Sequence, residues 1–128
     1  METFVTMHSW VRWLVLLGLV AAVGLGISRH LEGVGRWEPA YYRAAVIALD
    51  FQVLLGFILY VGNEGHDQGT FIAVFHPMFM LLALASAHLG LRFARTHQDA
   101  APDRVIGYSY FVSVVLIVAG IPWDRLGS

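Results

Sequence analysis

Histidines placed inside long apolar runs are the residues of this sequence that point most directly to chemistry. His76 opens the run from His76 to Arg95, His88 lies twelve residues further along it, and His8 stands at the head of an earlier run. An ionisable side chain is expensive in hydrocarbon and is usually functional there. Neutral imidazoles bind metals, and two of them on facing helices can ligate a haem iron from both sides. What these histidines can do depends on the elements that position them.

A basic residue accompanies the first histidine. Arg12 follows His8 by four residues, so on a helix the two side chains share one face. An arginine there suits a haem propionate, because a guanidinium binds carboxylates with two parallel hydrogen bonds. Small and aromatic residues are expected beside the macrocycle, provided that they face inward. The candidates are Gly18, Phe75, Phe79 and Ala83.

Asp50 is a second ionisable residue within an apolar run, and Gln52 lies close to it. We expect Asp50 at roughly the depth of His88, where the two groups can neutralise each other. This pair is either a structural clamp between two helices or a proton-linked or quinone-contacting pair. His88 as a further haem ligand is a third reading, weakened because no histidine on another run matches its depth.

The composition places these residues in a membrane. The 128-residue chain is 58% hydrophobic and 13% charged with a mean hydropathy of +0.66, which is too apolar for a small soluble domain. There is no cysteine, so a disulfide framework or thiolate metal site is excluded. The net charge of -1 argues against a nucleic-acid partner. The lipid bilayer is the expected surrounding.

Four apolar runs are long enough to cross the hydrocarbon core as helices, which takes about 20 residues each. The predicted spans are approximately 7–28, 41–61, 72–94 and 105–122. The start of the third is open, because Pro77 favours a first helical turn while the five residues before His76 are already apolar. Short connections predict one all-α domain, an integral membrane four-helix bundle with up-down-up-down topology.

Arginine distribution predicts the orientation. The connections after the first and third spans, together with the span ends that adjoin them, hold six of the eight arginines. The chain has no lysine, and the connection between the second and third spans holds no basic residue other than histidine. The positive-inside rule makes the arginine-bearing connections cytoplasmic and places both termini outside, in a bacterial plasma membrane. No cleavable signal is indicated before the first span. His8 and His76 then enter the membrane from the same side, at similar depth.

With these residues, the chain resembles small bacterial membrane b-type cytochromes, such as cytochrome b561-like proteins and the haem-bearing anchor subunits of succinate dehydrogenase. The resemblance covers all four spans, and its specific content is His8 with Arg12, and His76 with His88 on a helix rich in alanine and glycine. It implies haem b and electron transfer between a quinol pool or partner subunit and an outer-side acceptor. The two-haem pattern has two helices with two histidines each. Only the third span has such a pair here, which favours one haem over two.

Two other function classes stay open. Met7 beside His8, with Met78 and Met80 beside His76, brings thioethers close to imidazoles, a ligand mixture that suits Cu(I) binding or transport. A cofactor-free accessory subunit of a larger membrane complex, or a homo-oligomer, needs only the small-residue helix faces for docking. No soluble-enzyme motif is found, so catalysis is expected only as an electron-transfer subunit of an oxidoreductase.

Overall fold

The computed structural model describes residues 2–33 and 36–123, and in this part of the chain all regular structure is helical. The elements are α1 (Glu2–Glu32), α2 (Ala40–Gly62), the 3₁₀ turn η1 (Gly65–Asp67), the π-helical turn η2 (Phe71–Phe75), α3 (His76–Thr96) and α4 (Pro102–Gly120). The segments Glu2–Glu32, Ala40–Gly62, Phe71–Thr96 and Pro102–Gly120 are long and apolar enough to cross a membrane. The predicted all-α, four-helix membrane architecture is confirmed.

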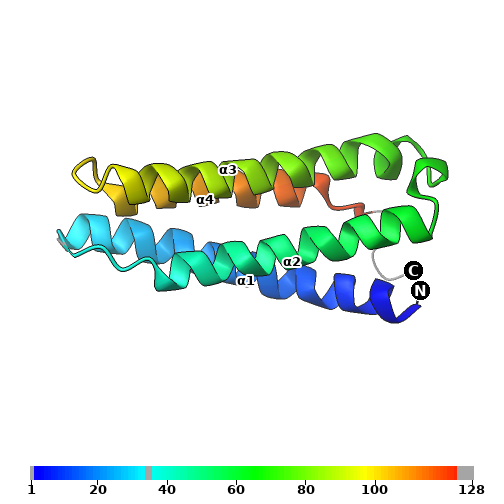
Figure 1. Cartoon of the computed structure of the whole chain (residues 1–128), viewed down its shortest axis with the longest axis horizontal. Helices are drawn as coiled ribbons and strands as arrows, with labels where there is room; N and C mark the ends of the chain where they lie inside the picture. The colour runs from blue at the N-terminus through cyan, green and yellow to red at the C-terminus, as the bar shows by residue number, and fades with distance from the viewer. Residues whose placement is uncertain (1, 34–35, 124–128) are drawn as a thin grey trace.

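The helices run alternately up and down, with each connection joining neighbours (Figure 1). α1 and α3 lie on a diagonal, because α4 packs extensively against both of them and α2 fills the fourth corner with fewer contacts to α3. The α1–α2 and α3–α4 connections share one end of the bundle, where six arginines gather; we call it the arginine end. The start of α1 and the α2–α3 connection lie at the opposite end.

Small residues on α3 allow its close packing with α4. The buried positions of α3 are Ala83, Ala87, Gly90 and Ala94, spaced three or four residues apart along one face. Facing them, α4 buries Ile106, Tyr110, Ser113 and Ile117. The Ser113 hydroxyl donates to the carbonyl of Ala83 at 2.7 Å, so this buried polar group is satisfied across the interface.

A polar network closes the arginine end. Asp103, in the first turn of α4, accepts a hydrogen bond from the buried Tyr42 hydroxyl at 2.7 Å and pairs with Arg29 at 3.2 Å. The Tyr110 hydroxyl donates to the carbonyl of Tyr42 at 2.9 Å. The network ties α1, α2 and α4 together. Arg29 was expected in the connection after the first span. In the structure α1 continues as a helix to Glu32, because Arg29 near its polar C-terminal end pairs with the carboxylate of Asp103.

The third span begins with η2, which runs directly into α3. Pro77 cannot donate a backbone hydrogen bond to the residue four positions earlier, and its ring crowds that carbonyl. The wider π turn relieves this conflict, and the carbonyl of Ala73 accepts a hydrogen bond from the Tyr60 hydroxyl at 3.0 Å instead. The segment is therefore helical before Pro77, and His76 stands at the junction of the two helix types.

Candidate functional site

The structure brings His8 and His76 together between the diagonal helices α1 and α3, at the end opposite the arginines. Their ring centroids are 6.3 Å apart, and the ring planes are perpendicular. Both side chains line a cavity of about 460 Å³ whose walls include residues of the α2–α3 connection. α1 is helical from Glu2, so His8 and Arg12 lie on one face of a continuous helix, and both line this cavity.

A backbone carbonyl fixes the protonation of His76. The Nδ1 atom of its ring lies 2.7 Å from the carbonyl oxygen of Gly120, at the end of α4. A carbonyl only accepts, so Nδ1 carries the proton and Nε2 of a neutral ring keeps its lone pair. Metal-binding histidines have this arrangement, in which a hydrogen bond to one nitrogen orients the other.

α2 supports His8 through two residues. Gln52 donates from Nε2 to the backbone carbonyl of His8 at 2.8 Å, which joins α2 to α1 at this depth. One turn further along, Gly56 leaves space for the ring: a Cβ there would stand 3.2 Å from Cε1 of His8. The polar Gln52 is therefore part of the wall around His8.

Three buried polar atoms in this region have no hydrogen-bond partner within the described chain. They are Nδ1 of His8, Nε of Arg12 and Oε1 of Gln52. The Arg12 guanidinium lies 4.7 Å from the centroid of the Trp13 ring, and in the described residues no carboxylate pairs with it. Buried polar groups in native proteins are nearly always satisfied. A polar ligand in this cavity would therefore find hydrogen-bonding groups on its walls.

A second, apolar cavity of about 300 Å³ adjoins the first. The residues that line both are His8, Gln52, Gly56, Tyr60, His76 and Met80. The apolar cavity adds side chains from α2 and α3 only, namely Val53, Phe57, Pro77 and Leu81. The histidines therefore stand between a polar chamber toward the bundle end and an apolar crevice between α2 and α3. A ligand that fits this place has a polar edge and an apolar body.

His8 and His76 are two candidate ligands for one metal ion, because their ring centroids lie 6.3 Å apart and they come from different helices. Within the described residues no group of three or more His, Cys, Asp or Glu side chains converges as a metal site. A haem iron needs only two protein ligands because the porphyrin supplies four nitrogens, whereas a bare zinc ion needs three or four.

The predicted partners Asp50 and His88 also meet. Oδ1 of Asp50 lies 2.6 Å from Nε2 of His88, and both side chains are about half exposed on the α2 and α3 surfaces. Neither residue lines the cavities beside His8 and His76. His88 was one of the predicted cofactor-binding residues; in the structure its Nε2 lies against Asp50, and whether it binds a cofactor stays a prediction.

Several residues expected near the ligand lie elsewhere. Gly18, Phe75, Phe79 and Ala83 do not line either cavity: Ala83 is buried against α4, and Phe79 lies against Gly120. Of the three methionines that the structure describes, Met7 and Met78 are exposed and only Met80 lines the cavities. Gly56 and Tyr60 were missed. The four-residue spacing of Gln52, Gly56 and Tyr60, which marks one helix face, is the signal that could have found them.

Comparison of the chain with protein-family models, with curated proteins and with solved structures found no match. The side chains that bear on function gather at the larger cavity: His8 and His76 lie close together there, a hydrogen bond orients the His76 ring, and unsatisfied polar atoms lie nearby.

Proposed function

We propose that the protein is a membrane b-type cytochrome that binds one haem b between α1 and α3 and transfers electrons. The observation that carries this proposal is the pair of imidazoles from diagonal helices with ring centroids 6.3 Å apart. The cavities beside them, of about 460 and 300 Å³, are in the size range of small-molecule sites. Bound haem supplies one-electron redox chemistry, which the amino-acid side chains lack.

Each residue of the site has a definite task in this proposal. His8 and His76 would hold the haem iron, and Gly120 orients the His76 ring through its carbonyl. Arg12, at the wall of the polar chamber, holds a propionate. Gln52 fixes the backbone at His8, and Gly56 keeps space beside that ring. The apolar side chains of the α2–α3 crevice exclude water from the ligand, which helps set a redox potential.

The position in the membrane belongs to the same proposal. The arginine end faces the cytoplasm of a bacterial cell by the positive-inside rule, so both termini and the haem site lie toward the outside. The protein then passes electrons between a quinol pool or a partner subunit and an acceptor on the outer side. Asp50 and His88, which lie within hydrogen-bonding distance, act either as a proton-linked or quinone-contacting pair or as a clamp between α2 and α3.

The direct test is the dithionite-reduced minus air-oxidised absorption spectrum of the protein purified in detergent, with a pyridine haemochrome assay for stoichiometry. We expect sharp α and Soret bands at about one haem per chain, as for bis-histidine ligation. His8→Ala and His76→Ala should each abolish the bands. His66→Ala is the matched control, because His66 lies at the same end of the bundle but in the exposed turn η1. A colourless wild-type preparation from haem-replete cells contradicts the proposal.

A further inference from the structure

Asp50 and His88 lie on the outer surface of the bundle, at the seam between α2 and α3. Asp50 is near the middle of α2, yet the two side chains are 43% and 48% exposed. Ionisable side chains within a membrane almost always face the interior of a bundle or a water-filled cavity, because they are expensive to place against lipid chains. Direct contact of this pair with lipid is therefore unfavourable, and a polar surface that covers the pair removes this contact.

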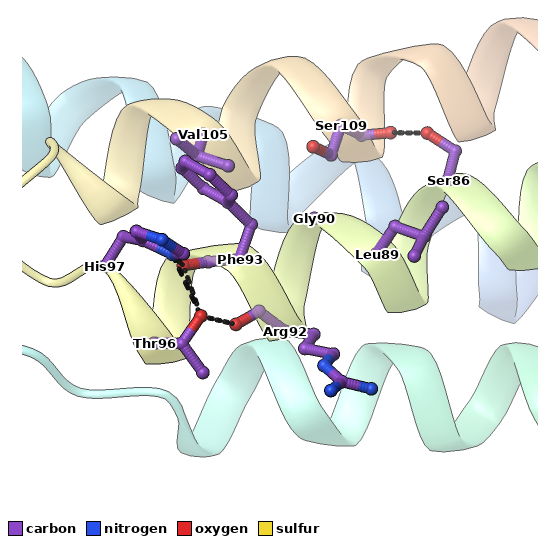
Figure 2. Close-up of a pocket in the computed structure, with 9 residues that line it drawn as sticks. All are labelled: Ser86, Leu89, Gly90, Arg92, Phe93, Thr96, His97, Val105 and Ser109. Carbon is purple, nitrogen blue, oxygen red and sulfur yellow. Dashed lines mark hydrogen bonds between the residues drawn. The ribbon is translucent and has the colours of Figure 1, made fainter.

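Arg92 belongs to the same side of α3. It follows His88 by four residues, and Figure 2 shows its side chain extending toward α2. Within the described residues no carboxylate forms an ion pair with it. The side of α3 that faces α4 is different, because the Ser86 hydroxyl donates to the carbonyl of Ser109 at 2.9 Å (Figure 2). The uncovered polar groups in the body of α3 therefore lie on its α2 side.

The Asp50–His88 pair leaves one hydrogen-bonding atom unused on each side chain. Oδ1 of Asp50 and Nε2 of His88 are 2.6 Å apart, whereas Oδ2 and Nδ1 have no hydrogen-bond partner in the part of the chain that the structure describes. When the pair carries no net charge, one proton lies between Oδ1 and Nε2 and a second lies on Nδ1. Nδ1–H is then a donor and Oδ2 an acceptor. The pair therefore presents one donor and one acceptor at a single depth.

Such a surface is complementary to a second copy of itself. Two copies of the chain insert with the same orientation, so a two-fold axis between them runs along the membrane normal and equivalent residues lie at equal depth. The unused donor of His88 in one copy then meets the unused acceptor of Asp50 in the other, and the reverse. We infer that this α2–α3 face is the interface of a homodimer, closed by two reciprocal hydrogen bonds from His88 Nδ1 to Asp50 Oδ2 of the second copy.

Apolar side chains beside the pair extend this face. Phe57 and Leu81 are 66% and 58% exposed, and each lies seven residues, close to two helix turns, from Asp50 and His88 respectively. All four side chains therefore share one side of the seam. Hydrogen bonds between polar side chains are one of the main forces that associate membrane helices. The inference does not rest on haem binding, because neither Asp50 nor His88 lines the cavities beside His8 and His76.

Sedimentation equilibrium of the protein in a density-matched mild detergent tests the inference. We expect the wild type at twice the chain mass of 14.2 kDa. The double variant Asp50→Leu/His88→Leu leaves neither group unpaired and should weaken the dimer at least about tenfold, the equivalent of about 1.4 kcal/mol for two interhelical hydrogen bonds. Ser86→Ala is the matched control, because it removes a polar group of α3 on the α4 side; dimer affinity should change by less than about twofold. A monomeric wild type, or an undiminished dimer in the double variant, would overturn the inference.

Exchanged side chains separate a contact between copies from a contact within one chain. Asp50→His places two imidazoles on the face of one protein, and His88→Asp places two carboxylates on the face of the other. Each variant should dimerise poorly with itself, whereas a mixture should form heterodimers, because every contact between the copies then joins an imidazole to a carboxylate. Energy transfer between the two dye-labelled variants in phosphatidylcholine vesicles measures this, with folding verified by circular dichroism. No excess of heterodimer over self-association would contradict the reciprocal hydrogen bonds. A monomeric wild type that retains a quinone at the pair would assign the face to that ligand instead.

Discussion

Oδ1 of Asp50 on α2 lies 2.6 Å from Nε2 of His88 on α3, within two helices that are long and apolar enough to cross a membrane. Among the described residues this is the one side-chain hydrogen bond that joins the bodies of α2 and α3, and these two helices pack against each other less extensively than the other neighbours. Interhelical hydrogen bonds stabilise membrane bundles where packing is sparse. If the pair acts as a clamp between α2 and α3, it adds a polar contact where the two helices pack sparsely.

A double-mutant cycle on Asp50→Leu and His88→Leu should reveal this coupling. His88→Leu leaves a carboxylate without its partner in an apolar setting, so we expect it to be the more destabilising single change. The double variant should be more stable than the sum of the two single losses predicts, with a coupling of about 1 kcal/mol. Reversible unfolding in mixed detergent micelles measures all four proteins. Additive losses would show that the two residues act independently.

Substitution of Gly26 should disrupt the contact between α1 and α4. A Cβ on Gly26 would lie 2.6 Å from the carbonyl oxygen of Asp103, which is backbone and cannot rotate away. We expect Gly26→Ala to lower the free energy of unfolding by about 1–3 kcal/mol through overpacking. Gly18→Ala, on the same helix, is the control because nothing lies within 4 Å of its added Cβ. The change in unfolding midpoint should be small or positive for the control.

The bundle could be predicted because the relevant signals are local. Hydropathy and length define four spans, and the clustered arginines separate the two ends of the bundle. Successive spans cross the membrane in opposite directions, so the first and third spans start on the same side. This is enough to predict that His8 and His76 lie at similar depth. The same reasoning placed Asp50 near His88, which the structure finds at hydrogen-bonding distance.

The walls of the site could not be predicted, because they depend on the rotation of each helix about its axis. Membrane helices are apolar all round, so their sequence gives little indication of the inward face. Phe75 directly precedes His76, and neighbouring residues of a helix point about 100° apart, so Phe75 does not line the cavity beside it. The contact of Arg29 with Asp103 was missed for another reason: it joins residues far apart in sequence.

The network at the arginine end should be sensitive to one hydroxyl. Tyr42→Phe removes the donor to Asp103, which is buried and would lose a charge-assisted hydrogen bond, so we expect a loss of about 1.5–3 kcal/mol in unfolding free energy. Its neighbour provides the control. Tyr41→Phe removes an exposed, 3.3 Å hydrogen bond to the carbonyl of Gly18 and should change stability by less than about 0.5 kcal/mol. Equal effects at the two positions would contradict a special role for the Asp103 network.

Gly56 offers a test of the proposed haem site that leaves both histidines in place. A Cβ at this position would stand 3.2 Å from the His8 ring, so the larger side chain of Gly56→Leu must displace the imidazole or fill the cavity. We expect haem content to fall at least about tenfold, the consequence of about 1.4 kcal/mol or more of lost binding free energy. Gly24→Leu introduces the same side chain on α1 where a Cβ has open space, and it should retain full haem content. Undiminished Soret absorbance in Gly56→Leu, with folding verified by circular dichroism, would place the haem away from His8.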